Sequence, residues 1–294
     1  LYYGVVTLRQ IVRSTLIKKH QPVLPCLEIT DWPDLKKRMI VNNLFGYRRL
    51  KSPRLYKHEI KRYIKEVVAG SKLNLYSLQL KFAVEFDKQS KIMKLEAKIP
   101  REDLAEIARY CKEHFVDFVP ALQSGGHSQF MTMRYKGLQD PDYDKRQSDV
   151  TYPGYYKMLF DMYEDILDAV PDAKYFHILH DEWWQHPKKD HVYALKGIPR
   201  WKLFAEDIKK IHAFFKKRNI RILMYADMLL SNHNGGGVLK TAKALDELPK
   251  DIIMTNWSLR TCPDSSMFLY KKGFEVWDTV NQFRCVPEKD KQII

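Results

Sequence analysis

The chain has 294 residues, enough for one large barrel or for two ordinary domains. Its formal charge is +14, but the basic residues are spread along the chain without the glycine and aromatic pattern of nucleic-acid-binding domains, so we expect no nucleic-acid partner. No apolar run approaches the roughly 18–20 residues that span a bilayer, and the cysteines form no CxxC pair typical of a structural zinc site.

The first 33 residues differ in pattern from the rest of the chain. Residues 5–17 have the apolar spacing of one helix, and residues 24–29 form a short apolar run that predicts a strand. Neither element joins the regular alternation that begins near residue 36. We therefore expect residues 1–33 to be the C-terminal remnant of a preceding small α/β domain, and residues 34–294 to form the main domain.

From residue 36 onward, short apolar runs alternate with longer amphipathic ones. The predicted strands are residues 39–41, 73–80, 115–122, 174–179, 220–226, 252–256 and 274–278. The predicted helices are residues 59–68, 100–114, 155–170, 201–218, 238–248 and 265–272. Seven strand–helix steps or partial steps favour parallel strands that are joined by crossover helices.

The fold class that fits this alternation is α/β: a (β/α)8 TIM-type barrel, truncated so that its last strand is missing. The structural alternative is an open doubly wound sheet, which normally carries a glycine-rich phosphate turn after its first strand, and none is present. Barrels place their active sites in the loops that follow the strands. The residues directly after each predicted strand are therefore the first candidates for function.

Two adjacent carboxylates, Asp181 and Glu182, follow the fourth predicted strand, with two histidines and two tryptophans nearby in residues 177–184. Such carboxylates beside apolar walls suit acid catalysis on a sugar, because burial raises the pKa of one carboxyl so that it can donate a proton. The neighbouring aromatic rings could stack on the faces of a pyranose. The alternative is that Asp181 and Glu182 only cap the next helix.

Other polar or aromatic side chains recur at the ends of the predicted strands. His127 lies on a glycine turn after the third strand, and Tyr225 and Asp227 end the fifth. Trp257 follows the sixth strand, and Arg38 opens the first. Single residues of this kind have ordinary alternatives: His127 as a structural loop residue and Trp257 as part of the core.

The sequence argues against a metal site and a serine nucleophile. His177 and His180 are three apart in a predicted strand, so their side chains are expected on opposite faces, where they cannot share a metal ion. No GxSxG elbow occurs, and Ser128 lacks that turn.

Together these segments resemble glycoside hydrolase family 20, the β-N-acetylhexosaminidases. Residues 126–128 (Gly-His-Ser) are similar to the family's Pro-Gly-His-Ser turn, and residues 177–182 to its catalytic His-x-Gly-Gly-Asp-Glu motif. Residues 225–228 resemble its fifth-strand Trp-x-Asp motif. Three earlier segments are also similar, in the family's order: residues 4–10 to the helix that closes its N-terminal domain, 29–33 with Arg38 to the barrel entry, and 72–74 to the start of the second strand.

The chain departs from the family pattern at several places. The paired glycines before Asp-Glu are Leu179 and His180 here, and the third-strand Glu-x-Asp is Ala-Leu-Gln at residues 121–123. The second-strand histidines are Ser77 and Gln79, and the eighth strand is missing. These changes affect substrate contacts and the support of the histidine more than the central carboxylates, so the resemblance implies a divergent member.

The resemblance also implies roles for individual residues. Glu182 would protonate the leaving glycosidic oxygen and later act as the base toward water. Asp181 would hold and polarise the substrate's 2-acetamido group, whose carbonyl oxygen attacks the anomeric carbon, so that no enzyme nucleophile is needed. Arg38 would grip hydroxyls of the terminal sugar and Trp257 would wall the pocket. The predicted substrate-binding residues are Arg38, His127, Tyr225, Asp227 and Trp257.

The expected function is therefore that of an exo-acting, retaining β-N-acetylhexosaminidase. Its substrate would be the terminal N-acetylhexosamine of an oligosaccharide or glycan, and neither a metal nor an organic cofactor is implied. Two alternatives remain: a glycosidase of other sugar specificity on the same barrel, and a non-catalytic carbohydrate-binding protein. The formal charge of +14 leaves room for an acidic glycan under each of them.

Overall fold

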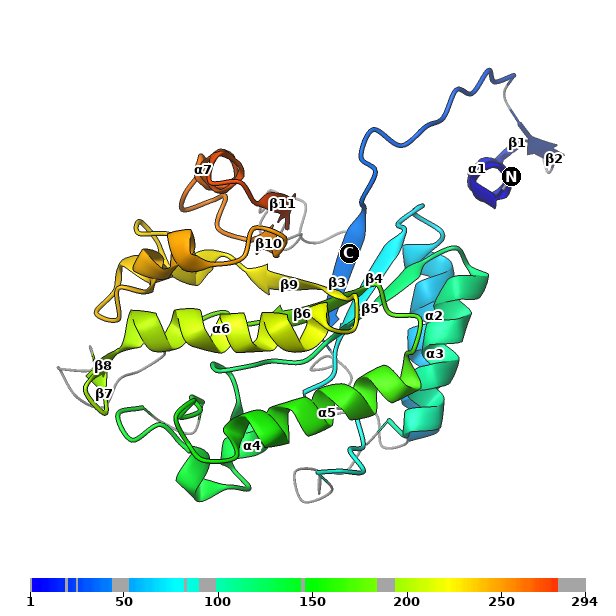
Figure 1. Cartoon of the computed structure of the whole chain (residues 1–294). Helices are drawn as coiled ribbons and strands as arrows, with labels where there is room; N and C mark the ends of the chain where they lie inside the picture. Colours follow the sequence, from blue (N-terminus) through cyan, green and yellow to red (C-terminus); the bar gives the residue numbers. More distant parts are fainter. Residues whose placement is uncertain are drawn as a thin grey trace.

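The computed structural model describes residues 2–18, 21–24, 26–43, 53–81, 84–89, 99–143, 146–183 and 194–279. Within these ranges the main sheet has seven parallel strands in the order β11-β10-β9-β6-β5-β4-β3 (Figure 1). The strands are β3 (Met39–Asn43), β4 (Leu75–Gln79), β5 (Asp117–Ala121), β6 (Tyr175–Leu179), β9 (Arg221–Tyr225), β10 (Ile253–Asn256) and β11 (Glu275–Asp278). All seven predicted strands are confirmed, and their sequential order is that of a truncated barrel, in which β3 and β11 are the described edges.

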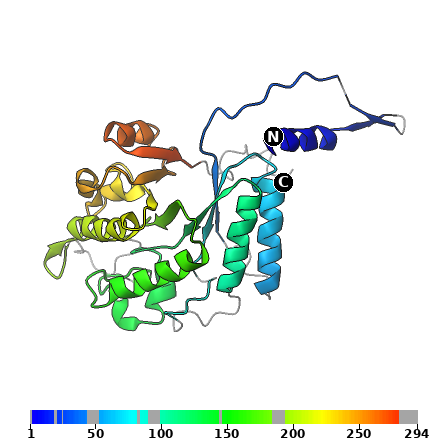
Figure 2. The ribbon, with the colours of Figure 1, turned by 45° about the vertical axis from the view of Figure 1, so that its right-hand side comes forward.

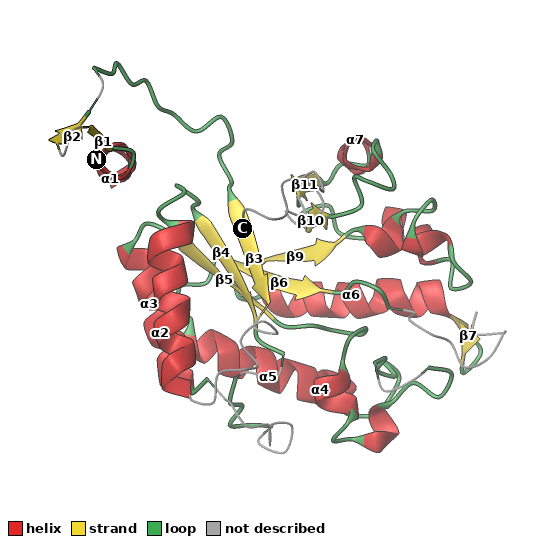
Figure 3. Cartoon of the chain, turned by 180° about the vertical axis from the view of Figure 1, so that it is seen from behind, coloured by secondary structure: helices red, strands yellow, loops and turns green. Residues whose placement is uncertain are grey.

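Helices cover the outer face of this sheet, as Figure 3 shows from behind. They are α2 (Pro53–Tyr63) with its π-helical continuation η2 (Ile64–Val68), α3 (Arg101–Glu113), α5 (Tyr155–Ala169), α6 (Arg200–Lys216) and α7 (Ser265–Lys271). The predicted helix at 238–248 is instead the 3-10 helix η7 (Thr241–Glu247), which begins after Lys240 in the left-handed region. Short elements in the loops are α4 (Gln129–Thr132), η4 (Lys136–Leu138), η5 (Asp227–Leu229), η6 (Asn234–Gly236) and the hairpin β7 (Ala194–Leu195) with β8 (Ile198–Pro199).

Strand β6 lies between α5 and α6, and its alternating side chains separate the two faces of the sheet. The Phe176 ring lies 4.9 Å from Tyr163 of α5 and 4.5 Å from Phe215 of α6, and all three are fully buried. Full burial of such a side chain contributes roughly 1.5–3 kcal/mol. The next residue, His177, points the other way, and its Nε2 is 3.0 Å from the Thr255 hydroxyl of β10. The end of β6 is therefore held rigidly from both faces.

The N-terminal segment follows a different course from the one predicted. Helix α1 (Tyr2–Arg13) is present, but β1 (Leu16–Lys18) and β2 (Gln21–Val23) form a separate antiparallel hairpin. The predicted strand at 24–29 is wrong: its described residues pair with no strand, and Leu24, Leu27 and Ile29 are exposed. An extended segment joins this unit to β3 (Figures 1 and 2). The assignment of residues 1–33 to a separate domain stays a prediction.

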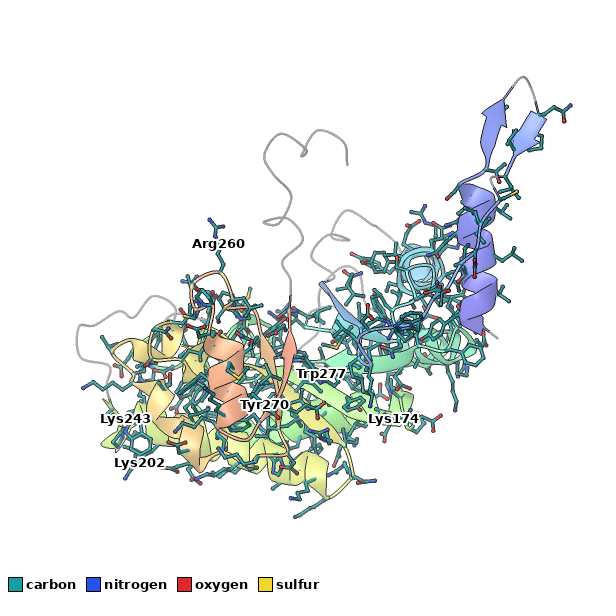
Figure 4. The ribbon with its side chains drawn as sticks, turned by 90° about the horizontal axis from the view of Figure 1, so that it is seen from above. Lys174, Lys202, Lys243, Arg260, Tyr270 and Trp277 are labelled. Atoms are coloured by element: carbon teal, nitrogen blue, oxygen red, sulfur yellow. The ribbon has the colours of Figure 1, made fainter. Side chains whose placement is uncertain are left out.

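Basic side chains are distributed over the surface that the structure describes. Lys174 precedes β6, Lys202 lies on α6, Lys243 on η7 and Arg260 in the loop after β10; in Figure 4 Lys174 and Arg260 lie apart from the other two. None of the helices in the described ranges combines the length and the apolar character that crossing a membrane requires.

Helix α6 buries a carboxyl group, that of Asp207, against the barrel. Burial raises the pKa of this carboxyl from its ordinary 3.8 to about 7, and the neighbouring Tyr156 hydroxyl and Lys210 ammonium offset this only in part. Because the folded protein keeps a proton that the unfolded chain releases above its ordinary pKa, the unfolding free energy falls as the pH rises from about 4 through about 7.

Asp207→Asn is therefore expected to stabilise the protein more at pH 8 than at pH 5, because the neutral amide needs no proton. The difference is about 3 kcal/mol at most, since about two pH units separate pH 5 from the folded pKa of about 7 and each unit corresponds to about 1.4 kcal/mol. Thermal unfolding of both proteins at the two pH values measures it. Asp251→Asn is the control, because the Asp251 side chain is 43% exposed. An equal effect of Asp207→Asn at both pH values would contradict the assignment.

Candidate active site

Two loops at the carboxyl end of the sheet bring their side chains together. Asp181 and Glu182 follow β6, and His127 follows β5. The His127 Nε2 lies 3.1 Å from Glu182 Oε2 and 3.7 Å from Asp181 Oδ2. The three side chains are 20–29% exposed, so they remain accessible from solvent. We expected these three side chains at one rim of the barrel, and the structure brings them together there.

The ionisation of Glu182 differs from the expectation of a raised pKa. The hydrogen bond from His127 lowers the pKa of this carboxyl and outweighs the effect of its partial burial, and the charges of His127, His233 and Lys81 add to the lowering. The sequence could not show this because His127 is 55 positions away. In the free protein the lowered pKa therefore favours the ionised form of Glu182.

Asp181 is oriented by a side chain that follows β5. Gln123 is fully buried, and its Nε2 donates a hydrogen bond of 2.8 Å to Asp181 Oδ1. This bond occupies one carboxylate oxygen and leaves Oδ2 facing the open side with His127. Gln123 stands where the family resemblance expects an acidic residue, so an amide donor replaces a charge beside Asp181.

Asp227 holds the backbone of Glu182 through a hydrogen bond. It is fully buried after β9, and its Oδ2 accepts hydrogen bonds from the Glu182 backbone N–H (3.1 Å) and from Asn234 Nδ2 (2.8 Å). Burial and then the charge of Asp181 raise the pKa of Asp227, which favours a neutral carboxyl there. The structure thus makes Asp227 a support for Glu182 rather than an exposed lining residue.

The predicted aromatic residues lie around the same rim. The Tyr225 ring is 4.7 Å from the His177 ring, and burial followed by the charge of Asp181 raises the pKa of Tyr225. The half-buried Trp257 packs edge-on against His233, with ring centroids 4.8 Å apart. The sequence did not indicate His233. Burial lowers the pKa of its imidazole, and the charge of Glu182 opposes this lowering, so His233 interacts with Glu182 as well as with Trp257.

Arg38 is not part of this cluster, and its predicted role is corrected here. It precedes β3, so it lies at the amino end of the sheet, opposite the carboxylates. Its guanidinium donates to the carbonyls of Lys72 and Leu35 and to the Tyr3 hydroxyl. These contacts stabilise the entry to the barrel, and none of them involves a residue of the cluster.

The loop after β6 has an unusual backbone. Leu179, His180 and Glu182 all have positive φ values, of 61°, 61° and 46°. Two of these positions are glycines in the family motif, and each non-glycine residue there costs about 1–2 kcal/mol. The β6–β9 register also shifts between His177 and Leu179. The surrounding contacts must hold this conformation in place.

Gly125 leaves no room for a side chain beneath this loop. A Cβ atom there would lie 2.3 Å from Trp183 Nε1 and 3.1 Å from His180 Cε1, and its φ is +67°. Gly125→Ala is therefore expected to lower the unfolding free energy by about 1–3 kcal/mol beyond the backbone cost. Gly154→Ala measures that cost alone, because φ is +91° there and nothing lies within 4 Å. If Gly125→Ala and Gly154→Ala lose the same unfolding free energy in denaturant, the neighbouring Trp183 side chain moves aside for the added Cβ atom.

The cluster could also be considered as a cation site, because ligand atoms of His127, Asp181 and Glu182 lie within 4.8 Å of one another. A cation would have to displace the 3.1 Å hydrogen bond between His127 and Glu182. The geometry fits a hydrogen-bonded pair, and the absence of a metal requirement stays a prediction.

Comparison with known proteins places the chain in a family. The catalytic-domain profile of glycosyl hydrolase family 20 matches residues 55–284. No curated protein sequence matches. Among solved structures, the chain is similar to the exo-β-N-acetylglucosaminidase of Vibrio harveyi (TM-score 0.73, 15% identity, 96% of this chain and 46% of that one). It is also similar to the β-N-acetylhexosaminidase of Streptomyces coelicolor (0.69, 17%, 95% and 56%) and the chitobiase of Flavobacterium johnsoniae (0.69, 19%, 94% and 42%).

These structures share the fold, and the chain spans about half of their length. The profile match covers most of the chain, including every strand from β4 to β11. The chain therefore belongs to glycosyl hydrolase family 20, of which it carries the catalytic domain.

Proposed function

We propose that the protein is an exo-acting, retaining β-N-acetylhexosaminidase that uses the 2-acetamido group of its substrate as the nucleophile. The observation that supports this is the cluster of His127, Asp181 and Glu182 at the carboxyl end of a family 20 barrel. The names of the similar structures, which include a β-N-acetylglucosaminidase and a chitobiase, favour N-acetylhexosamine as the sugar.

In the first step Glu182 protonates the glycosidic oxygen. Glu182 takes up this proton before the step, because the bound sugar displaces water and so disfavours the charged carboxylate beside His127. The bond between the anomeric carbon and the leaving oxygen then breaks, and the alcohol departs with that proton. At the same time the acetamido carbonyl oxygen bonds to the anomeric carbon, which gives a cyclised cation.

Asp181 stabilises the charge on this intermediate. Because Gln123 holds Oδ1, Oδ2 is the oxygen left to face the acetamido N–H. In the second step water attacks the anomeric carbon and gives its proton to Glu182, and the acetamido group is released. Two inversions at one carbon give overall retention.

A second candidate is a glycosidase for a different sugar. Ser77 and Gln79 occupy the second-strand positions of family histidines, and Lys81 follows the same strand. Burial lowers the pKa of Lys81, while the charges of Asp181 and Glu182 oppose this lowering, so its amino group interacts with both carboxylates. An anionic substituent on the sugar would favour the charged form of this amino group.

The test is hydrolysis of aryl β-N-acetylglucosaminide and β-N-acetylgalactosaminide, with and without a mimic of the cyclised intermediate. Turnover that the mimic inhibits tightly would support the proposed mechanism, because only an acetamido-assisted enzyme is complementary to it. Turnover of acidic or non-acetamido glycosides alone would favour the second candidate. Binding without any turnover, by a folded protein, would indicate a carbohydrate-binding role.

A further inference from the structure

The segment that carries Asp181 and Glu182 is bracketed by two buried rings. The His180 ring lies 4.8 Å from Phe204 of α6, and the Trp183 ring lies 5.3 Å from the same phenylalanine. The two rings also stack on each other, 6.2 Å apart with an interplanar angle of 22°. His180, Trp183 and Phe204 are almost completely buried. Helix α6 is thus the platform on which both ends of the carboxylate segment rest.

The imidazole of His180 connects this platform to the loop after β5. Its Nδ1 is 2.8 Å from the Ser124 hydroxyl, which in turn lies 3.3 Å from the Ile178 carbonyl oxygen. Its Nε2 is 3.7 Å from Asp207 Oδ2 on α6 and has no hydrogen-bond partner among the described residues. A buried ring nitrogen without a partner costs about 1–3 kcal/mol, so a small ring rotation or one bridging water would be favourable here.

The backbone conformation at position 180 does not favour a histidine. Its φ of 61° is the conformation that glycine adopts without strain, and the family motif has glycine there. A strained histidine is retained only where its side chain makes compensating contacts. The contacts with Ser124, Phe204 and Asp207 are those that a glycine would lose.

We propose that His180 and Asp207 form a buried positioning pair that fixes Asp181 and Glu182 relative to helix α6. In its neutral form the pair makes one consistent chain of donors. After the small ring rotation, or through the bridging water, the Asp207 carboxyl donates to His180 Nε2, while Nδ1–H donates to Ser124 Oγ and the Ser124 hydroxyl donates to the Ile178 carbonyl. The effect on catalysis rests on the proposed function, whereas the pairing itself does not.

Three variants of the protein test the pair. His180→Gly removes the ring and relieves the backbone strain. His180→Asn tolerates the left-handed conformation and can still reach Ser124, but it is too short to reach Asp207. Asp207→Leu removes the donor on α6 and nearly keeps the size of the side chain. The matched control is Asp251→Asn, which alters another histidine–aspartate pair of α6, at His212, where the Nε2–Oδ1 distance is 2.8 Å.

All three variants are expected to fold and to lose kcat by roughly 10- to 100-fold, as small misplacements of catalytic groups do, with little change in KM. The control should keep wild-type kcat and KM. Wild-type kcat in folded His180→Gly would overturn the proposal, and so would a loss confined to KM.

A second measurement does not depend on activity. In NMR spectra of the protein, Asp207→Leu should shift the His180 ring nitrogens and the backbone amides of Asp181 and Glu182, while Asp251→Asn should leave them in place. If the wild-type protein turns over no substrate, the proposed function fails and these shifts alone decide the pairing. Unmoved signals in Asp207→Leu would overturn it.

Discussion

Glu182→Gln is expected to lower kcat on β-N-acetylhexosaminides with an alcohol leaving group by about 10²–10⁴-fold, the usual contribution of a general acid. The amide keeps the shape of the side chain and can still accept the hydrogen bond from His127 Nε2, now 3.1 Å from Oε2. What it cannot do is carry a proton to the leaving oxygen. The loss should therefore appear in kcat, with the unfolding temperature close to that of the wild type.

The leaving group separates this role from a general disturbance of the site. A phenol of low pKa needs no protonation to depart, so Glu182→Gln should be far less impaired on such a substrate in the first step. A control is Glu275→Gln at the amino end of the sheet, where the carboxyl pairs with Arg221 at 2.8 Å and is 42% exposed. Equal losses on activated and unactivated substrates would contradict the acid role of Glu182.

The strands were predictable from the sequence because parallel strands buried on both faces leave continuous apolar runs. The meeting of His127 with Asp181 and Glu182 was predictable for a related reason: residues that follow parallel strands gather at one edge. Arg38 was misplaced because it precedes its strand, and a residue at that position lies at the opposite edge. Whether a residue precedes or follows its strand therefore explains both the correct and the incorrect prediction.

Other features of the site depend on partners far apart in the chain. The lowered pKa of Glu182 comes from His127, and the hold on its backbone comes from Asp227, 45 positions away. Asp207 lies inside an amphipathic helix, where a lone carboxylate is usually solvated. The strand predicted at 24–29 failed because an apolar run forms a strand only where a neighbouring strand can pair with it.

Arg200→Met is expected to lower the unfolding free energy by about 3–5 kcal/mol, because it leaves a buried charge without its partner. Arg200 is the first residue of α6 and is fully buried. Its guanidinium binds Asp140 with two nitrogens and Asp142 at 2.9 Å, and it lies 4.9 Å from the Tyr143 ring. Denaturant unfolding measures the loss, and the exposed pair of Arg62 with Glu59 should give less than about 1 kcal/mol on Arg62→Met.

Arg200→Met should also disturb the catalytic cluster, because its partners Asp140 and Asp142 belong to the long loop that supports His127. Asp140 N–H donates to the Gln147 carbonyl, and the next residue, Ser148, bonds Ser128 Oγ at 2.7 Å beside His127. Removing Asp140 together with Arg200, as Asp140→Leu with Arg200→Met, should recover most of the stability, since an apolar pair has no charge to desolvate. If Arg200→Met alone is as stable as the wild type, the ion pair does not hold this loop, and His127 is positioned by the other contacts of the loop, among them that of Ser128 with Ser148.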